Sequence, residues 1–174
     1  MRIHPFFIAL FLIVSVSHYV EAQDSKDVFT IYLVRHAEKM TTDKDSKDPS
    51  LTPCGAQRAE SLAGFFEQID LQQIYSTDYT RTKNTASPVA KSKEKELEFY
   101  DPRSLEDFAK IIRSKKENAL IVGHSNTTGV LAGLLSEQEI GSFDESIYNR
   151  IYQVVFFKKE GHLQILTSSF VCVK

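Results

Sequence analysis

The sequence predicts an α/β fold, a three-layer sandwich in which helices flank a mostly parallel central sheet. Two apolar runs, 28–34 and 119–123, have the continuous β-branched and aliphatic character of strands that are buried on both faces. Segments with helical spacing of apolar residues separate the strand candidates, and this alternation is typical of a parallel sheet. The tail alternates apolar and polar residues over 150–157 and 162–167, with a turn at 160–161, which predicts a closing antiparallel hairpin.

Further elements are expected between these strands in a regular order. Thr52-Pro53 opens a helix that extends to about residue 67, because Thr suits the N-cap and Pro suits the first helical position. A second helix is expected from 79 to about 90, and Pro88 should end or bend it early. The polar segment 39–50 is expected to be an exposed loop. The remaining expected elements are short strands at 73–76 and 97–100 and helices at 105–116 and 128–135.

Residues 1–22 have the three-part layout of a secretory signal peptide. A short, weakly positive start is followed by an uncharged apolar run from Phe6 to Val16, and Val20 and Ala22 stand where a cleavage site needs small residues. The run is shorter than the roughly 20 residues that span a bilayer, so we expect cleavage, a single exported domain over 23–174 and no stable membrane anchor. A buried N-terminal helix or an uncleaved anchor is the alternative.

The composition fits one ordinary globular domain. The 174 residues are 42% hydrophobic and 25% charged with a net charge of −2, which indicates no nucleic-acid or membrane-surface partner. Cys54 and Cys172 lack the Cys-x-x-Cys spacing of redox and zinc sites. In an exported chain they could form a disulfide, and they could equally be two small buried residues.

Charged and titratable side chains follow both buried strands. Arg35 and His36 come at the carboxyl end of the first strand, and His124 comes at the same end of the other. Functional sites of open parallel sheets lie beyond these ends, so we expect the side chains to meet. Arg81 falls in the first turn of a helix, where the helix dipole disfavours a cation. A bound anion would compensate, and in the simpler interpretation Arg81 is a surface residue that pairs with Asp78. Guanidiniums match phosphate oxygens and a neutral histidine can accept a phosphoryl group, so this set predicts a phosphate pocket.

The motifs occur in a recognisable order. They run from Val34-Arg-His-Ala-Glu-Lys39 through Leu51-Thr-Pro-Cys-Gly55, Tyr75-Ser76, Arg81-Thr82 and Thr85-Ala86 to Val122-Gly-His-Ser-Asn-Thr127. This set resembles the histidine phosphatase superfamily, also called phosphoglycerate mutase-like, whose Arg-His-Gly motif here has Ala37 in place of the common Gly. The resemblance covers nearly the whole mature chain, and the compact branch that includes phosphohistidine phosphatases is the most similar.

The resemblance implies a metal-independent phosphatase that needs no cofactor and hydrolyses phosphomonoesters or phosphoramidates through a phosphohistidine. It makes His36 the nucleophile, and it makes Arg35, Arg81 and His124 the rest of the phosphate pocket. Asn126, or backbone amides at the start of the following helix, would add donors. The implied substrate is a small phosphorylated molecule or a phosphoprotein. The chain lacks the large insertions of mutases and phytases, so mutase activity is not expected.

The sequence departs from the family pattern in its proton donor. Many members supply a carboxylate that protonates the leaving oxygen, but Ser125 stands where some members have Asp after the second histidine. Glu98 and Asp101 are the available carboxylates after the third strand, and neither sits in a clear motif. A phosphoramidate leaving group is easily protonated and needs less help. The donor is therefore Glu98, Asp101 or none, and Glu38 is expected to orient a neighbour or to line the entrance.

Two other functions remain as alternatives. The same pocket could bind a phosphorylated ligand without turning it over. His36, His124 and Glu38 could also ligate iron or zinc, although the adjacent arginines would repel a cation. The segments 40–50 and 137–147 are expected to wall the pocket and to carry specificity, and their polar composition indicates no obvious apolar ligand. An exported location also makes an intracellular phosphorelay target less natural.

Overall fold

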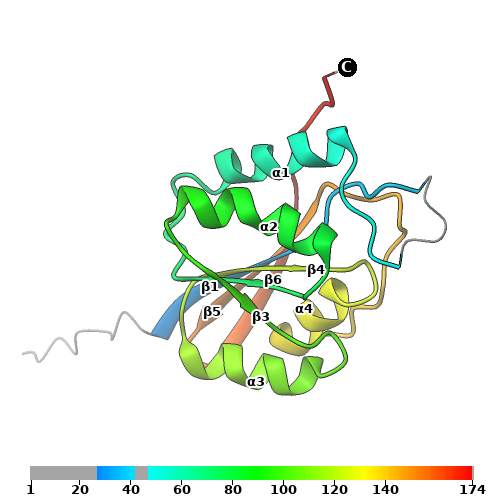
Figure 1. Ribbon diagram of the computed structural model, residues 1–174. Helices are drawn as coiled ribbons and strands as arrows, with labels where there is room; N and C mark the ends of the chain where they lie inside the picture. The colour runs from blue at the N-terminus through cyan, green and yellow to red at the C-terminus, as the bar shows by residue number, and fades with distance from the viewer. Residues whose placement is uncertain (1–26, 42–46, 174) are drawn as a thin grey trace, which may run out of the picture.

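A computed structural model describes residues 27–41 and 47–173, so the predicted signal peptide and part of the polar loop lie outside the described residues. Within the described part, one six-stranded sheet carries helices on both faces (Figure 1). In chain order the elements are β1 (Val28–Arg35), α1 (Pro53–Phe65), β2 (Gln73–Ser76), α2 (Thr80–Ser92), β3 (Leu97–Phe99), α3 (Leu105–Lys115), β4 (Ala119–Gly123), α4 (Thr128–Ser136), β5 (Arg150–Phe157) and β6 (Glu160–Thr167).

The strand order is β3-β2-β4-β1-β5-β6. Strand β1 pairs in parallel with β4 and antiparallel with β5, so the first strand of the chain lies inside the sheet. Strand β2 pairs in parallel with β3 and β4, and β5 and β6 form the antiparallel hairpin at the other edge. This topology confirms the predicted α/β sandwich with its mostly parallel sheet and C-terminal hairpin.

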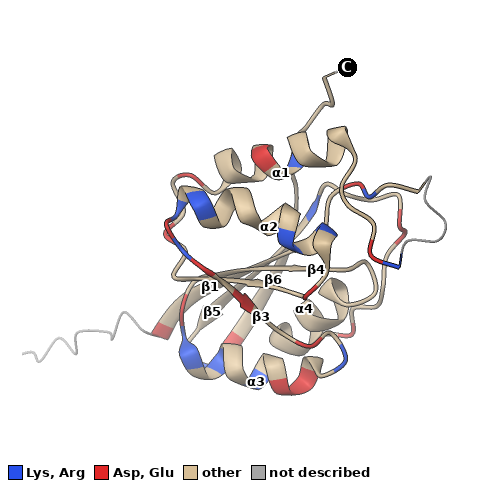
Figure 2. Ribbon diagram, in the orientation of Figure 1, with Lys and Arg blue, Asp and Glu red and all other residues tan. Residues whose placement is uncertain are grey.

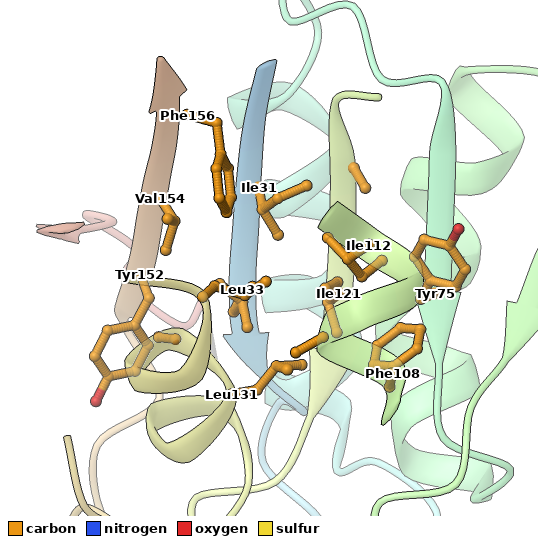
Figure 3. Packing of buried hydrophobic residues seen from close by; sticks show 14 of the residues in the cluster. Ile31, Leu33, Tyr75, Phe108, Ile112, Ile121, Leu131, Tyr152, Val154 and Phe156 are labelled. Atoms are coloured by element: carbon orange, nitrogen blue, oxygen red, sulfur yellow. The ribbon is translucent and has the colours of Figure 1, made fainter. Parts of the chain in front are cut away.

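Alternate residues of the central strands supply two separate cores. Ile31 and Leu33 of β1 face α3 and α4, where they pack with Phe108 and Leu131, and β5 adds Phe156 (Figure 3). The other residues of β1, such as Tyr32 and Val34, face α1 and α2, where Leu62, Phe66 and Val89 fill the second core. A strand that is buried on both faces has little room for movement, so β1 is a rigid support for the residues that follow it.

Two details differ from the sequence-based expectations. Helix α2 continues to Ser92, beyond Pro88, because the burial of Val89 and Ala90 on the helix face that meets the core offsets the hydrogen bond that proline removes. The hairpin turn lies at 158–159 rather than 160–161, and Lys158 has a positive φ of 59°. Gly161 instead belongs to β6, where a Cβ atom would collide with the carbonyl oxygen of Leu135.

The tail after β6 returns to α1. Cys54 near the start of α1 forms a disulfide with Cys172, with a Cα–Cα distance of 5.5 Å, so the structure selects the disulfide over two separate buried thiols. The side-chain amide of Gln57 donates to the carbonyl of Val173 at 3.1 Å, and its oxygen accepts from the Val173 amide at 3.1 Å. The ring of Phe170 lies against the guanidinium of Arg58, 4.6 Å from its carbon.

Charged residues of both signs occur on the outer faces of the helices, as Figure 2 shows for α1 and α3. This mixture is typical of a solvated surface. None of the helices in residues 27–41 and 47–173 has the length and apolar character that crossing a bilayer requires.

Candidate active site

The two histidines meet because their strands are neighbours in register. Arg35 is the partner of Gly123 in the parallel β1–β4 ladder, and the His36 amide donates to the Gly123 carbonyl at 2.9 Å. His36 follows Arg35 and His124 follows Gly123, so the two histidines come at the same level on neighbouring strands. The imidazole centroids of His36 and His124 lie 5.5 Å apart with an interplanar angle of 69°. The expected convergence at the carboxyl edge of the sheet is present.

His36 is held in one tautomer by its own loop. Its Nδ1 lies 2.8 Å from the carbonyl oxygen of Ala37, and since a carbonyl only accepts, Nδ1 carries the proton and Nε2 is left with its lone pair. Burial, reinforced by the charges of Arg35 and Arg81, lowers the pKa of His36 from 6.5 to about 3. The ring is therefore neutral at neutral pH, which is the form that a nucleophilic nitrogen requires.

Helix α2 fixes the backbone beyond His36. The buried Ala37 amide donates to the Thr85 hydroxyl at 2.9 Å, and that hydroxyl in turn donates to the Arg81 carbonyl at 2.7 Å. The histidine loop is thus joined to the helix turn that carries an arginine of the site. The sequence motif contained Thr85 without revealing this role, because the contact spans 48 residues and depends on the packing of α2 against the sheet.

His124 is positioned by three threonine or tyrosine side chains. Its Nε2 lies 3.1 Å from the Thr77 hydroxyl, and its backbone amide donates to the Thr127 hydroxyl at 3.0 Å. The Tyr79 ring meets the imidazole edge-on, with centroids 5.1 Å apart. Burial and the charges of Arg81 and Arg35 lower the pKa of His124 to about 4, so the second histidine is neutral at neutral pH until an anion offsets those charges.

Arg35 is nearly fully buried, with 3% of its surface exposed. One Nη donates to the Glu145 carbonyl, the guanidinium lies 4.3 Å from the centroid of the Tyr148 ring, and Nε has no hydrogen-bond partner among the described residues. A buried guanidinium that keeps an uncommitted donor can accept an anion at little extra desolvation cost.

Arg81 occupies the first turn of α2 as expected, but its acidic neighbour is not Asp78. Asp78 pairs with Lys83 at 2.7 Å, whereas Arg81 lies 3.3 Å from Asp48. The same Asp48 carboxylate accepts from the amide and the hydroxyl of Thr80, and so provides the negative charge that the helix N-terminus favours. Arg81 Nε is buried without a hydrogen-bond partner among the described residues.

These groups surround one cavity of about 270 Å³. Three arginines and a lysine line the cavity, against a single acidic residue, Glu145, whose backbone carbonyl accepts from Arg35. The cavity therefore favours an anion. Asn126, the predicted additional donor, is on its wall. The full lining is Arg35, His36, Lys39, Tyr79, Arg81, Pro102, Arg103, His124, Ser125, Asn126, Thr127 and Glu145.

A comparison with protein-family models gives one match. Residues 31–102 match the model of the histidine phosphatase superfamily, branch 1, and this segment includes Arg35, His36 and Arg81. Over this segment the chain is similar to the histidine phosphatase superfamily. The matched segment starts within β1 and ends after β3, and His124 joins the site from the next strand of the sheet.

Solved structures of several phosphatases share the fold. The protein histidine phosphatase SixA complexed with tungstate is 13% identical with a TM-score of 0.66, over 79% of this chain and 96% of that one. A mycobacterial glucosyl-3-phosphoglycerate phosphatase is 12% identical with a TM-score of 0.65, over 82% and 100%. Phosphoserine phosphatase from Entamoeba histolytica is 16% identical with a TM-score of 0.61, over 81% and 98%. Among curated proteins, no sequence matches this chain.

The carboxylates that were candidates for proton donation lie elsewhere. Glu98 pairs with Lys115 at 3.0 Å and Asp101 pairs with Arg103 at 2.9 Å, and neither lines the cavity. Glu38 points to α1, where its carboxylate binds Arg58 at 2.6 Å. It therefore orients a neighbour and does not line the entrance. Within the part of the chain that the structure describes, no group of three His, Cys, Asp or Glu residues is arranged to hold a metal ion.

The sequence did not single out several residues that line or support the site. Tyr79, Lys39 and Arg103 line the cavity, and Thr77 contacts His124 from the end of β2. All of them follow a strand, so the general rule for parallel sheets was the signal that could have found them. Of the two segments expected to wall the pocket, 137–147 contributes Glu145, and 40–50 contributes Asp48 through its contact with Arg81.

Proposed function

We infer that this protein is a phosphatase that hydrolyses phosphomonoesters or phosphoramidates through a phosphohistidine on His36 and needs no metal ion. The observation that carries this inference is the free Nε2 of a neutral His36 beside Arg35, Arg81 and His124 in one cavity. The match of residues 31–102 to the histidine phosphatase superfamily model supports the same activity.

The first step forms a bond from His36 Nε2 to phosphorus and breaks the bond from phosphorus to the leaving oxygen or nitrogen, which takes the electron pair and a proton from solvent. In the second step a water oxygen attacks phosphorus, the N–P bond breaks, the electron pair returns to Nε2, and the proton that the water loses passes to solvent. The guanidiniums of Arg35 and Arg81 stabilise the charge on the transferring oxygens. A bound phosphate dianion offsets both arginines, and this favours protonation of His124 in the complex.

The test replaces His36 by Ala and measures hydrolysis of 4-nitrophenyl phosphate. We expect a loss of more than about a thousandfold, because the covalent route disappears with the nucleophile. His162→Ala is the matched control, since His162 is exposed on the edge strand β6 and should keep full activity. A chelator should leave the wild-type rate unchanged. Acid-labile labelling of the wild type by a ³²P substrate, absent in His36→Ala, would identify the intermediate. Full activity in His36→Ala would overturn the proposal.

A second candidate function is non-catalytic binding of a phosphorylated ligand. Glu98 lies outside the cavity, and the hydrogen bond from Arg103 lowers the pKa of Asp101. This favours the second function, because neither carboxyl group is then suited to protonate an alkoxide leaving group. Tight binding of phosphate or vanadate with no turnover of aryl phosphates or phosphoramidates would select this function over hydrolysis.

We also propose that the protein is exported after cleavage before Gln23. The Cys54–Cys172 disulfide supports this, since such bonds persist in oxidising compartments and are rare in the cytosol. Fractionation of cells that express the full chain, followed by N-terminal sequencing of the exported form, tests both parts. Recovery of an uncleaved chain in the cytosol would refute them.

A further inference from the structure

A second cavity, of about 530 Å³, adjoins the phosphate cavity. Tyr79, Pro102 and Arg103 line both of them, so a ligand can extend from one into the other. The remaining walls are formed by the last residue of β3 and by residues that follow β2 and β3. They are Asp78, Phe99, Tyr100 and Asp101.

This second cavity is aromatic where the first is cationic. Phe99 is 57% exposed and Tyr79 is 37% exposed, although large apolar side chains are stabilised when they are covered. Tyr79 stands at the junction, because its ring also meets the His124 imidazole. The group attached to a phosphoryl on His36 can therefore lie against Tyr79 and Phe99.

The charges in the second cavity are already paired. Asp78 binds Lys83 at 2.7 Å, and Asp101 binds Arg103 through both its oxygens, at 3.0 and 2.9 Å. In contrast, Arg35 and Arg81 of the phosphate cavity each keep a buried Nε atom without a partner among the described residues. A second anionic group on the substrate would find no uncommitted cation beside Phe99. This favours an uncharged group in that position.

We propose that the second cavity is the leaving-group subsite, and that the preferred substrates are phosphate esters of uncharged alcohols that carry an aromatic ring. The inference rests on the proposed phosphatase function and names its substrate class. From the sequence, the polar segments 40–50 and 137–147 are expected to carry specificity. In this proposal the aromatic residues Tyr79 and Phe99 are instead the main determinant of specificity.

The experiment compares kcat/KM for benzyl phosphate and ethyl phosphate. Both esters release a primary alcohol, so their ratio reports binding of the ring and not the ease of breaking the P–O bond. Burial of the ring should favour benzyl phosphate by about tenfold or more. Phe99→Ser should bring the ratio toward one. The control Phe157→Ser should keep it, because Phe157 is similarly exposed but ends β5 beside Val28, at the opposite edge of the sheet from the site. Thermal unfolding of each variant checks that the fold is intact.

A parallel binding measurement keeps the subsite testable without turnover. Calorimetric titration with benzylphosphonate and ethylphosphonate should show tighter binding of the former, and Phe99→Ser should remove the difference. Hydrolysis of both esters at equal efficiency, or a ratio that survives Phe99→Ser, would overturn the subsite and leave the phosphatase function in place. Absence of all hydrolysis together with preferential benzylphosphonate binding would overturn the phosphatase function alone. Equal binding of both phosphonates would overturn the subsite.

Discussion

Removal of the Cys54–Cys172 disulfide should lower the stability of the folded protein substantially. The bond joins residues with a sequence separation of 118, so it restricts most of the unfolded domain. The chain-entropy relation for a loop of that length gives about 5 kcal/mol at 25 °C. With a urea dependence of about 2 kcal/mol per M, the unfolding midpoint should fall by about 2.5 M.

The assay is urea unfolding, followed by circular dichroism, of the wild type and of a Cys54→Ser/Cys172→Ser double variant. The wild type in a thiol reductant should match the double variant, which separates loss of the bond from the effect of serine. Gln57→Ala is a matched control, because it removes the hydrogen bonds to Val173 but keeps the bond, and it should cost less than about 1 kcal/mol. A double variant within 1 kcal/mol of the wild type would refute the reasoning.

The other predictions concern His36 and its support. Because the pKa of His36 is lowered from 6.5 to about 3, kcat/KM corrected for substrate ionisation should stay level as the pH falls from 7 to about 5, and an acid limb near 6.5 would contradict this. The unfolded chain binds more protons than the folded one between those pKa values, so the free energy of unfolding should fall as the pH drops through that window, and less so in His36→Asn. Thr85→Val leaves the buried Ala37 amide without its acceptor and should cost about 1–3 kcal/mol in urea unfolding. Ser87→Ala removes an exposed hydroxyl-to-carbonyl bond of the same helix and should cost little; equal losses would argue against the role of Thr85.

The sheet could be predicted from the sequence because its strands are encoded locally. The apolar runs at 28–34 and 119–123 are long enough to identify buried strands without knowledge of their partners. The hairpin turn could not be placed in the same way. Gly161 suggested a turn, but glycine is needed there for the close approach of the Leu135 carbonyl, and Lys158 adopts the left-handed conformation instead. A glycine in the sequence does not distinguish these two uses.

The site shows the same division between local and long-range information. Arg35, His36 and His124 could be brought together in advance, because adjacent parallel strands end at one edge. The partner of Arg81 could not, since Asp48 reaches it from a loop 33 residues earlier while the nearer Asp78 turns to Lys83. Glu98 and Asp101 likewise find cations on α3 and beside β3, and no local pattern indicates that they turn away from the cavity.

The interior position of β1 also determines when the site can form. It is the first of the described strands to leave the ribosome, yet its neighbours β4 and β5 begin only at Ala119 and Arg150. A nascent chain therefore carries an apolar strand with no partner until most of the domain has been made. Over that interval the polypeptide cannot complete its fold around His36. The phosphate cavity is therefore absent during most of synthesis and forms only when β4 and the hairpin that follows it are available.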